Sequence, residues 1–158
     1  MAGMLQGRDE IIVAAPVTKI WSLISDSSRL PEWGPPVRSV DVLGESRDPE
    51  RLGSRRRVHA EFDGKRGHFV EVRTEHEEGR KIAYLIEEET FGLFKVMSRP
   101  GFSLEIEPAG KDATRVVFSF FHEPKGLLGS LLNVLVIRRA QRKNRLAALV
   151  SLKERGER

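Results

Sequence analysis

The chain of 158 residues contains no cysteine, and this single absence excludes several kinds of chemistry. Without thiols there is no disulfide bridge, no thiolate ligand for a metal ion and no cysteine nucleophile. Histidine is also scarce, and His76-Glu77 lacks the second histidine that a zinc-protease helix requires. A zinc site would need several histidines to converge with a carboxylate; the candidates are His59, His68, His76 and His122. We therefore expect no metal site and no cofactor.

Long hydrophobic runs and nucleotide-binding loops are missing as well. No apolar run approaches the roughly 18 residues that a membrane span requires. Residues 1–7 lack the charged-then-apolar pattern of a signal peptide. The chain has neither a glycine-rich phosphate loop nor the Gly-x-Ser-x-Gly motif of a serine nucleophile. These absences predict a cytoplasmic protein without stable membrane insertion.

Charge of one sign does not dominate, because 27 basic and 23 acidic residues leave a net charge of only +4. Basic and acidic side chains are mixed along most of the chain, which is typical of a solvated surface. With 39% hydrophobic and 32% charged residues, the composition is that of an ordinary globular protein. The length predicts a single domain over residues 1–158.

The N-terminal part of the sequence predicts one strand and two short helices. Residues 9–14 are apolar and rich in β-branched side chains, as in a strand. Pro16 suits the first turn of a helix, and apolar residues follow it at helical spacing: Val17, Ile20, Trp21 and Ile24. A second short helix is predicted from Leu30 to Trp33, because an N-cap precedes it and Gly34-Pro35-Pro36 ends it.

From residue 37 to residue 123 the apolar period changes to two, which indicates β-strands. Alternation and turn signals place them at residues 37–44, 55–62, 65–76, 82–86, 94–107 and 114–122. Residues 46–53 form a polar loop between the first two of them. Short connections between consecutive strands favour antiparallel pairing.

The turn at Asp63-Gly64 leaves the register of its hairpin open. A two-residue turn would place His59 opposite His68, whereas a three-residue turn would place Val58 opposite His68. We favour the three-residue turn, because it aligns His68 with the valines at positions 58, 70 and 72 on one face. His68 would then point into the interior, where an imidazole can donate, accept or shuttle a proton.

The C-terminal segment predicts one long helix that begins near Leu127 or Leu131 and ends near Glu154. About 24 residues give a helix of about 36 Å, enough to cross a small domain. At 100° per residue one broad stripe is apolar; its members are Leu131, Leu132, Leu135, Val136, Leu146, Ala147, Leu149 and Val150. Arg139 and Lys143 fall inside this stripe, so we expect one of them to turn inward. Three further arginines, Arg138, Arg142 and Arg145, are expected to be solvated.

Together these elements predict an α+β fold in which a curved antiparallel sheet of about six to seven strands wraps the long helix. A single straight helix cannot fill the concave side of a twisted sheet, so an apolar cavity is expected between them. An inward cation on the helix would have to form an ion pair, extend its side chain to solvent or contact a ligand. Its acidic partner could be any of Glu71, Glu87, Glu88 and Glu89.

Several segments resemble the START/Bet v 1-like (SRPBCC) superfamily, in particular its bacterial polyketide cyclase/dehydrase and lipid-transport members. They are the opening IIVAAPVTKIWSLISDSSRLPEW, the strand pair around GRKIAY, and TRVVFSFFHEPKGLLG. The resemblance covers about residues 10–154. It implies a helix-grip fold around a deep pocket for a hydrophobic small molecule such as a lipid, a polyketide or an aromatic compound. Some members of the superfamily catalyse cyclisation or dehydration, and many only carry or sense a ligand.

The side of each predicted strand or helix that faces the cavity predicts a set of ligand-binding residues. They are Trp33, His68, Val70, Tyr84, Phe94, Phe102, Phe118, Phe120, Leu131, Leu135 and Arg139. His68 and Tyr84 are the candidate acid/base groups, and Arg139 is a candidate anchor for an anionic head group. Phe91 and Phe94 would form a flap over the cavity mouth, with Gly92 as a hinge.

We expect the protein to bind a hydrophobic small molecule as a carrier or a sensor. One alternative is a polyketide cyclase or dehydratase that uses His68 and Tyr84, and another is a co-chaperone-like protein-interaction module. No nucleic-acid partner is expected, because no stacking aromatic lies among the C-terminal arginines. A membrane surface is not expected either, because the helix has no aromatic anchor and its apolar stripe is needed to close the sheet. The assembly is expected to be a monomer or a homodimer.

Overall fold

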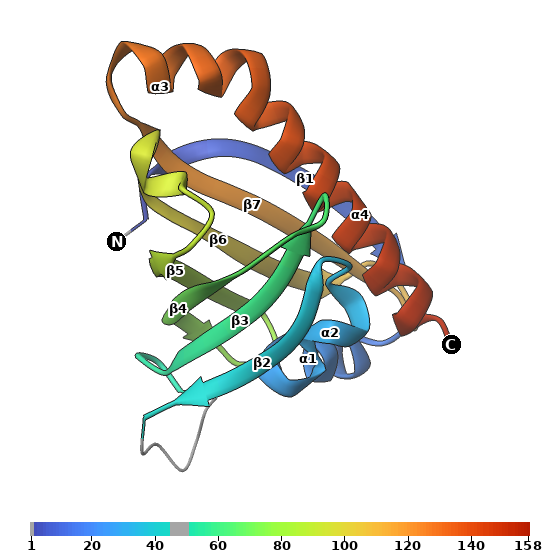
Figure 1. Cartoon of the computed structure of the whole chain (residues 1–158). Helices are drawn as coiled ribbons and strands as arrows, with labels where there is room; N and C mark the ends of the chain where they lie inside the picture. Colours follow the sequence, from blue (N-terminus) through green and yellow to red (C-terminus); the bar gives the residue numbers. More distant parts are fainter. Residues whose placement is uncertain (1, 45–50) are drawn as a thin grey trace.

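A computed structural model describes residues 2–44 and 51–158, and its strands form one curved antiparallel sheet (Figure 1). The strands are β1 (Met4–Val13), β2 (Val37–Leu43), β3 (Arg55–Phe62), β4 (Lys65–Glu77), β5 (Lys81–Glu89), β6 (Met97–Pro108) and β7 (Thr114–Pro124). The helices are α1 (Val17–Ser25), α2 (Leu30–Trp33), α3 (Gly126–Leu132) and α4 (Arg138–Gly156). The predicted helix-grip architecture is confirmed: seven strands and two short helices after β1 precede the long C-terminal helix. Residues 46–50 of the predicted polar loop lie outside the described residues.

The order of the strands in the sheet is β1-β7-β6-β5-β4-β3-β2. The chain therefore starts at one edge and must cross to the other before β2. The two short helices, with the 3-10 turn η1 (Ser27–Arg29) between them, make this crossing. Trp33 ties α2 to α1, because its indole Nε1 donates to the carbonyl oxygen of Leu23 at 3.0 Å.

An ion-pair cluster holds α2 against the C-terminal end of α4. Glu32 accepts hydrogen bonds from Arg29, at 2.7 Å from Nε, and from Arg155, at 2.9 Å from Nε. These two guanidinium groups lower the pKa of Glu32 to about 2, although partial desolvation acts in the opposite direction. The carboxylate therefore stays charged, and it links two elements that border the interior.

The hairpin at Asp63-Gly64 has the two-residue turn, so the three-residue turn that we favoured is wrong. Asp63 and Gly64 both adopt positive φ, 49° and 81°, as the mirror-image turns of tight hairpins require. Consequently His59 pairs with His68 across the two strands. An aspartate followed by a glycine tolerates this backbone, and no third residue is needed to close the turn.

This register reverses the faces that we assigned to β4. Val58 now pairs with Phe69, and both side chains lie on the cavity wall. Because successive side chains of a strand point to opposite faces, His68 and Val70 lie on the other side of the sheet. The backbone N–H of His68 donates to Thr90 Oγ1 at 2.9 Å, and its ring lies 6.0 Å from the ring of His59.

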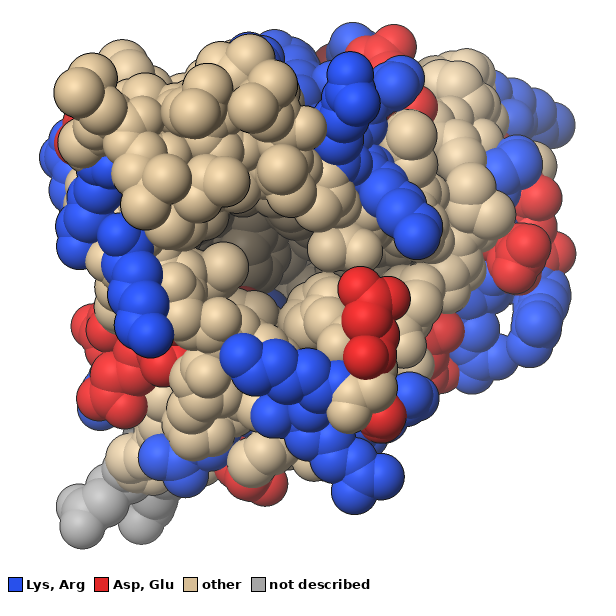
Figure 2. Space-filling model, turned by 45° about the horizontal axis from the view of Figure 1, so that its top comes forward, with Lys and Arg blue, Asp and Glu red and all other residues tan. Residues whose placement is uncertain are grey.

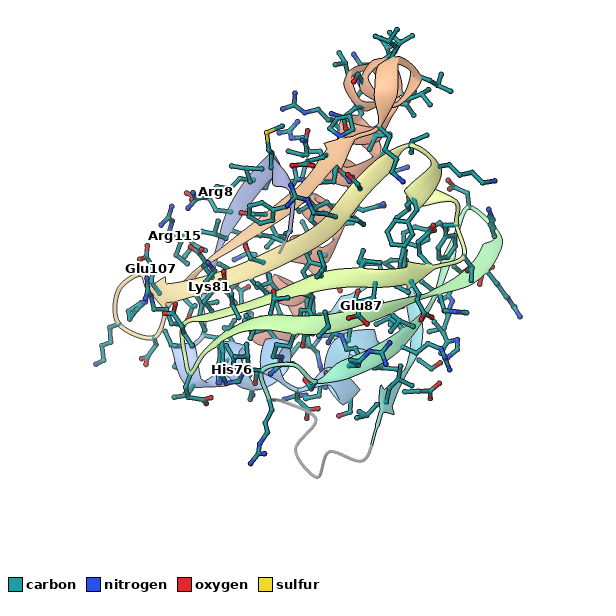
Figure 3. All side chains as sticks on the ribbon, turned by 90° about the vertical axis from the view of Figure 1, so that its left-hand side faces the viewer. Arg8, His76, Lys81, Glu87, Glu107 and Arg115 are labelled. Atoms are coloured by element: carbon teal, nitrogen blue, oxygen red, sulfur yellow. The ribbon has the colours of Figure 1, made fainter. Side chains whose placement is uncertain are left out.

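The outer face of the sheet carries charged side chains (Figure 3). Arg115 on β7 donates to Glu107 on β6 at 2.5 Å, and these two labelled residues lie side by side in the figure. Lys81 lies 2.6 Å from Glu75 and 3.4 Å from Glu105, and these carboxylates raise its pKa. Such exposed pairs contribute little to stability, but they mark this face as the solvated one.

The C-terminal helix is continuous over 31 residues but contains a π-helical segment, η3 (Asn133–Ile137), between α3 and α4. A π turn takes up an extra residue, so the helical phase on one side of it does not carry over to the other. The stripe that we predicted at a constant 100° per residue is therefore wrong at six of its eight positions, although Leu149 is buried as predicted. Leu131 and Leu135 are more than half exposed, and the buried residues of this helix are Gly129, Asn133, Arg145, Ala148, Leu149, Leu152 and Gly156.

The same change of phase decides which cation turns inward. Arg139 and Lys143 are exposed, so the prediction that one of them faces the interior is wrong. Arg145, which we expected to be solvated, is buried instead, and its guanidinium contacts Asp9 on β1 at 2.7 Å and 2.8 Å. Arg138 and Arg142 are exposed, as expected.

Candidate functional site

A cavity of about 440 Å³ lies between the concave face of the sheet and the C-terminal helix. Its mouth is visible as a hollow beneath the apolar surface at the top of Figure 2. Most of the wall is apolar or aromatic; the aromatic residues are Trp33, Phe62, Phe69, Phe91, Phe102, Phe118, Phe120 and Phe121. A volume of this size matches that of cavities that enclose a small organic ligand.

Four of the nominated residues lie on the cavity wall: Trp33, Phe102, Phe118 and Phe120. The three phenylalanines belong to β6 and β7 and form a cluster with ring centroids 5.0 Å to 6.4 Å apart. Phe102 pairs with Phe120, and Phe118 pairs with Leu104, so the strand phase at this end of the sheet was predicted correctly. The edge-to-face contacts hold the rings in fixed positions along the wall.

The other nominated residues are not on the wall. His68 and Val70 are on the opposite face, for the reason given above, and Leu131, Leu135 and Arg139 point to solvent because η3 changes the helical phase. Phe94 lines a separate shallow depression together with Lys65 and Glu89. Tyr84 faces the interior, as its phase predicted, but it lies behind Phe102, whose ring stacks on it at 5.3 Å.

One buried ion pair interrupts the apolar wall. Glu71, which lines the cavity, accepts a hydrogen bond from Arg56 Nε at 2.8 Å, and both side chains are at least 93% buried. Arg56 also donates to Ser27 Oγ at 3.2 Å, and its guanidinium lies 3.9 Å from the centre of the Tyr84 ring. A charged pair in this setting is a fixed dipole beside the cavity, able to orient a polar group of a bound molecule.

Arg73 forms a second polar layer behind this pair. It is fully buried, donates to the Tyr84 hydroxyl at 2.9 Å from Nε, and donates to the carbonyl oxygen of Ser25 at 2.8 Å. Its Nη1 also lies 3.0 Å from His76 Nδ1. The tyrosine hydroxyl is thus engaged as an acceptor inside the protein, and it points toward α1 rather than toward the cavity.

A neutral histidine lies where α4 crosses β7. His122 is buried; its Nε2 lies 2.6 Å from Asn133 Oδ1, and its Nδ1 lies 3.3 Å from Gln141 Nε2. These partners assign the proton to Nε2, because Nδ1 must accept from the amide of Gln141. Burial lowers the pKa of His122, and the nearby charge of Arg138 acts in the same direction, whereas the bond to Asn133 opposes them. Gln141 lines the cavity, and within residues 2–44 and 51–158 its Oε1 is buried without a hydrogen-bond partner.

The segment between β5 and β6 borders the mouth of the cavity. It contains the 3-10 turn η2 (Leu93–Lys95), and Phe91, Leu93 and Val96 lie on the cavity wall. The carboxylate of Glu89 accepts from the backbone N–H groups of Phe91, at 2.7 Å, and Phe94, at 3.2 Å. Burial acts to raise the pKa of Glu89, but the backbone donors together outweigh it and lower the pKa.

No cluster of three or more potential metal-ligating side chains occurs in the part of the chain that the structure describes. Among the same residues, no helix is long and apolar enough to cross a membrane. The polar side chains on the otherwise largely apolar cavity wall are Glu71, Gln141 and Asn144, of which Glu71 pairs with Arg56.

Comparison with known families decides what this arrangement belongs to. The model of the family "Polyketide cyclase / dehydrase and lipid transport" matches residues 4–157. The chain belongs to this family. Comparison with curated proteins by sequence gives no significant match.

Solved structures share the fold of this family member at low sequence identity. A START superfamily protein from Mycobacterium smegmatis superposes with a TM-score of 0.73 and 21% identity, over 97% of either chain. The Zhui aromatase/cyclase from a Streptomyces species gives a TM-score of 0.77 and 18% identity, over 96% of this chain and 93% of that one. Norcoclaurine synthase from Thalictrum flavum gives a TM-score of 0.68 and 16% identity, over 94% of this chain and 83% of that one. At such identities the likeness establishes the fold alone.

Sequence reasoning missed the polar residues of this family member's cavity. Glu71 was considered only as a partner for a cation on the C-terminal helix, whereas its partner Arg56 is on the neighbouring strand. Direct pairing of these two positions follows from the two-residue turn, so the correct register would have indicated the ion pair. Strand alternation places His122 of β7 on the same face as Phe118 and Phe120, but no pattern in the sequence distinguishes Gln141, because the π-helical segment determines where it points.

Proposed function

We propose that this protein binds a mostly apolar small molecule with a polar end in its cavity, and acts as a carrier or a sensor of that molecule. The observation that carries the proposal is the cavity of about 440 Å³ with its largely apolar and aromatic wall. Empty apolar space of this size forfeits packing that a core would otherwise have, so a ligand that fills it regains those contacts.

Two polar positions support a ligand that is not wholly apolar. Glu71 lines the cavity and pairs with Arg56, so a hydroxyl or amine of the ligand can donate to its carboxylate. The buried Oε1 of Gln141 is an acceptor for a second donor. The phenylalanine rings that β6 and β7 contribute to the wall suit a ligand whose main part is aromatic or polyunsaturated. The synthase with the same fold was crystallised with dopamine and hydroxybenzaldehyde, both small aromatic molecules with hydroxyl groups, which supports this class of ligand.

The enzymatic alternative loses the residues on which it depended. His68 is on the outer side of the hairpin, and the hydroxyl of Tyr84 is engaged by Arg73 behind the wall. The two groups therefore cannot act together on one substrate as acid and base. Geometry thus favours binding over cyclisation or dehydration, since a candidate base must reach the proton that it removes.

The proposal is tested by filling the cavity. Ala60 on β3 is buried and lines the cavity, so Ala60→Trp places an indole in the ligand space. Ala147 on α4 is exposed and is not on the wall, so Ala147→Trp is the matched control. The probe is 1-anilinonaphthalene-8-sulfonate, an aromatic molecule with one polar end, and its fluorescence titration gives the affinity. Native mass spectrometry of freshly purified protein reports any ligand that co-purifies.

We expect Ala60→Trp to weaken probe binding by at least about tenfold, because about 1.4 kcal/mol of lost apolar contact suffices for that change. Ala147→Trp should bind like the wild type, and thermal melting verifies that both variants fold. Equal affinity in the wild type and a folded Ala60→Trp variant would show that the probe binds elsewhere, and the proposal would then fail.

A further inference from the structure

The first half of the C-terminal helix exposes large apolar side chains to solvent. Between 55% and 92% of the surface of each is exposed; they are Leu127, Leu128, Leu131, Val134, Leu135 and Val136. We refer to these six residues of α3 and η3 as the leucine surface. Proteins rarely leave so many neighbouring leucines and valines in water without a partner, because each carries an unfavourable hydration cost.

The leucine surface is held in this orientation by what lies behind it. Gly129 packs closely against Val96, the residue before β6. A Cβ at position 129 would lie 2.5 Å from the carbonyl oxygen of Val96. One turn later, the amide of Asn133 contacts His122 at 2.6 Å. Gly129 and Asn133 are thus buried on the inward side of this segment, in close contact with the residues behind them. The leucines and valines are on the outward side because Gly129 and Asn133 occupy the inward side.

Positive charge surrounds the leucine surface. No aspartate or glutamate occurs from residue 124 to residue 153. The exposed cations of this stretch are Lys125, Arg138, Arg139, Arg142 and Lys143. Two more exposed lysines, Lys65 and Lys95, line the shallow depression beside Phe91 and Phe94. Figure 2 shows the result as a tan surface above the hollow, with blue side chains on both sides of it.

The leucine surface also adjoins the mouth of the cavity. Val136 belongs both to this surface and to the cavity wall, and Ile137 and Ala140 continue the wall along the helix. In Figure 1 α3 projects past the end of the sheet, and its exposed leucines therefore form an apolar tip. A tip of leucines with cations beside it matches the two layers of an anionic bilayer surface, acyl chains and phosphates.

We propose that the leucine surface docks this protein on anionic lipid bilayers, with the leucines inserted at the boundary of head groups and acyl chains. The surrounding lysines and arginines contact lipid phosphates, and the cavity mouth then faces the bilayer. A second copy of the chain fits less well, because a two-fold contact would bring the same cations of both copies together. The docking does not depend on what the cavity binds. It also removes the reason for excluding a membrane surface, since this part of the helix does not close the sheet.

The experiment is vesicle flotation with the full chain. One set of vesicles is pure phosphatidylcholine, and the other contains about 30% phosphatidylglycerol, an anionic lipid. We expect the protein to float with the anionic vesicles, and binding to weaken severalfold when salt is raised from 0.05 M to 0.5 M, because salt screens the cations. Flotation with neither set of vesicles would overturn the proposal, and so would equal flotation with both.

Two variants separate the leucines from the cations. The triple variant Leu127→Ser/Leu128→Ser/Leu131→Ser should bind at least about tenfold more weakly, because the inserted apolar area is lost. Its matched control is Ile12→Ser/Leu52→Ser/Val150→Ser, which removes exposed apolar side chains elsewhere and should bind like the wild type. Arg139→Glu/Lys143→Glu should abolish the preference for the anionic vesicles. An equal loss of vesicle binding in both triple variants would contradict the proposal. The proposal would also fail if the wild type sedimented as a dimer and the leucine variant as a monomer.

Discussion

The buried pair of Arg145 and Asp9 permits a sharp prediction about stability. The guanidinium of Arg145 retains 4% of its side-chain exposure and the carboxylate of Asp9 retains 15%, at a separation of 2.7 Å. The guanidinium also lies 5.1 Å from the centre of the Phe120 ring. Gly7 makes room for it, because a Cβ at that position would lie 2.5 Å from Nη2. The guanidinium is therefore packed against the backbone of β1 and close to the Phe120 ring.

Asp9→Ala leaves this guanidinium buried without its counter-ion. Loss of one partner of a buried pair costs about 3–5 kcal/mol, and partial exposure of Asp9 places the expected cost near the lower end, about 3 kcal/mol. With a urea m-value of about 2 kcal/mol/M, the unfolding midpoint should fall by about 1.5 M. Urea denaturation followed by circular dichroism measures this shift.

The double variant Asp9→Val/Arg145→Met is the control for this prediction. It replaces both charges by apolar groups of similar size, so no charge remains buried, and most of the lost free energy of unfolding should return. A decrease of less than about 0.3 M for Asp9→Ala would correspond to the weak coupling of a surface pair. Such a result would refute the conclusion that Arg145 is the inward cation of this helix.

Two further predictions concern pH. The pKa of Glu89 is lowered in the folded state, so its contribution to stability is present above its unfolded value, about 4.3, and is lost as pH falls through the lower folded value. Glu89→Gln should therefore accelerate amide exchange at residues 91–94 at pH 7, and the wild type should show the same acceleration only in acid. The pKa of His122 is lowered by burial, so folding excludes a proton that the unfolded chain binds. The urea midpoint should fall as pH decreases from about 7 to about 5, across the unfolded histidine pKa of about 6.5, and His122→Gln should remove that part of the dependence.

The sequence predicted the kind and order of the elements well, because period and turn residues are local signals. The bounds of β3 match the prediction at both ends, since Asp63-Gly64 marks one end unambiguously. The register across that turn was predicted incorrectly. One residue more or less in the turn exchanges the two faces of a strand, and both turns suit an aspartate followed by a glycine. Placement of His68, Val70 and Glu71 depended on that single choice.

The helix shows a second limit of sequence reasoning. A wheel at constant 100° per residue treats the leucines of α3 as core, because leucines normally are buried. The π-helical segment breaks that phase, and its cause lies in contacts distant in sequence. Asn133 turns toward His122 of β7, and Gly129 fits against the backbone of Val96. These tertiary contacts outweigh the local apolar pattern, so neither the buried Arg145 nor the exposed Leu131 was predictable from spacing alone.

The existence of the cavity follows from where the helix is allowed to approach the sheet. At its C-terminal end Gly156 lets α4 come close to α1 and to the end of β1, since a Cβ there would lie 2.7 Å from Ile20 and 3.0 Å from Val13. At the other end Gly129 permits an equally close approach. Between these two contact points Val136 and Ile137 line the cavity first, and small or polar side chains follow them on the helix: Ala140, Gln141, Asn144 and Ala148. The cavity lies between these side chains and the phenylalanines of the sheet. Replacement of these short side chains by leucines would produce a filled core, and the cavity is thus a property of the helix as much as of the curved sheet.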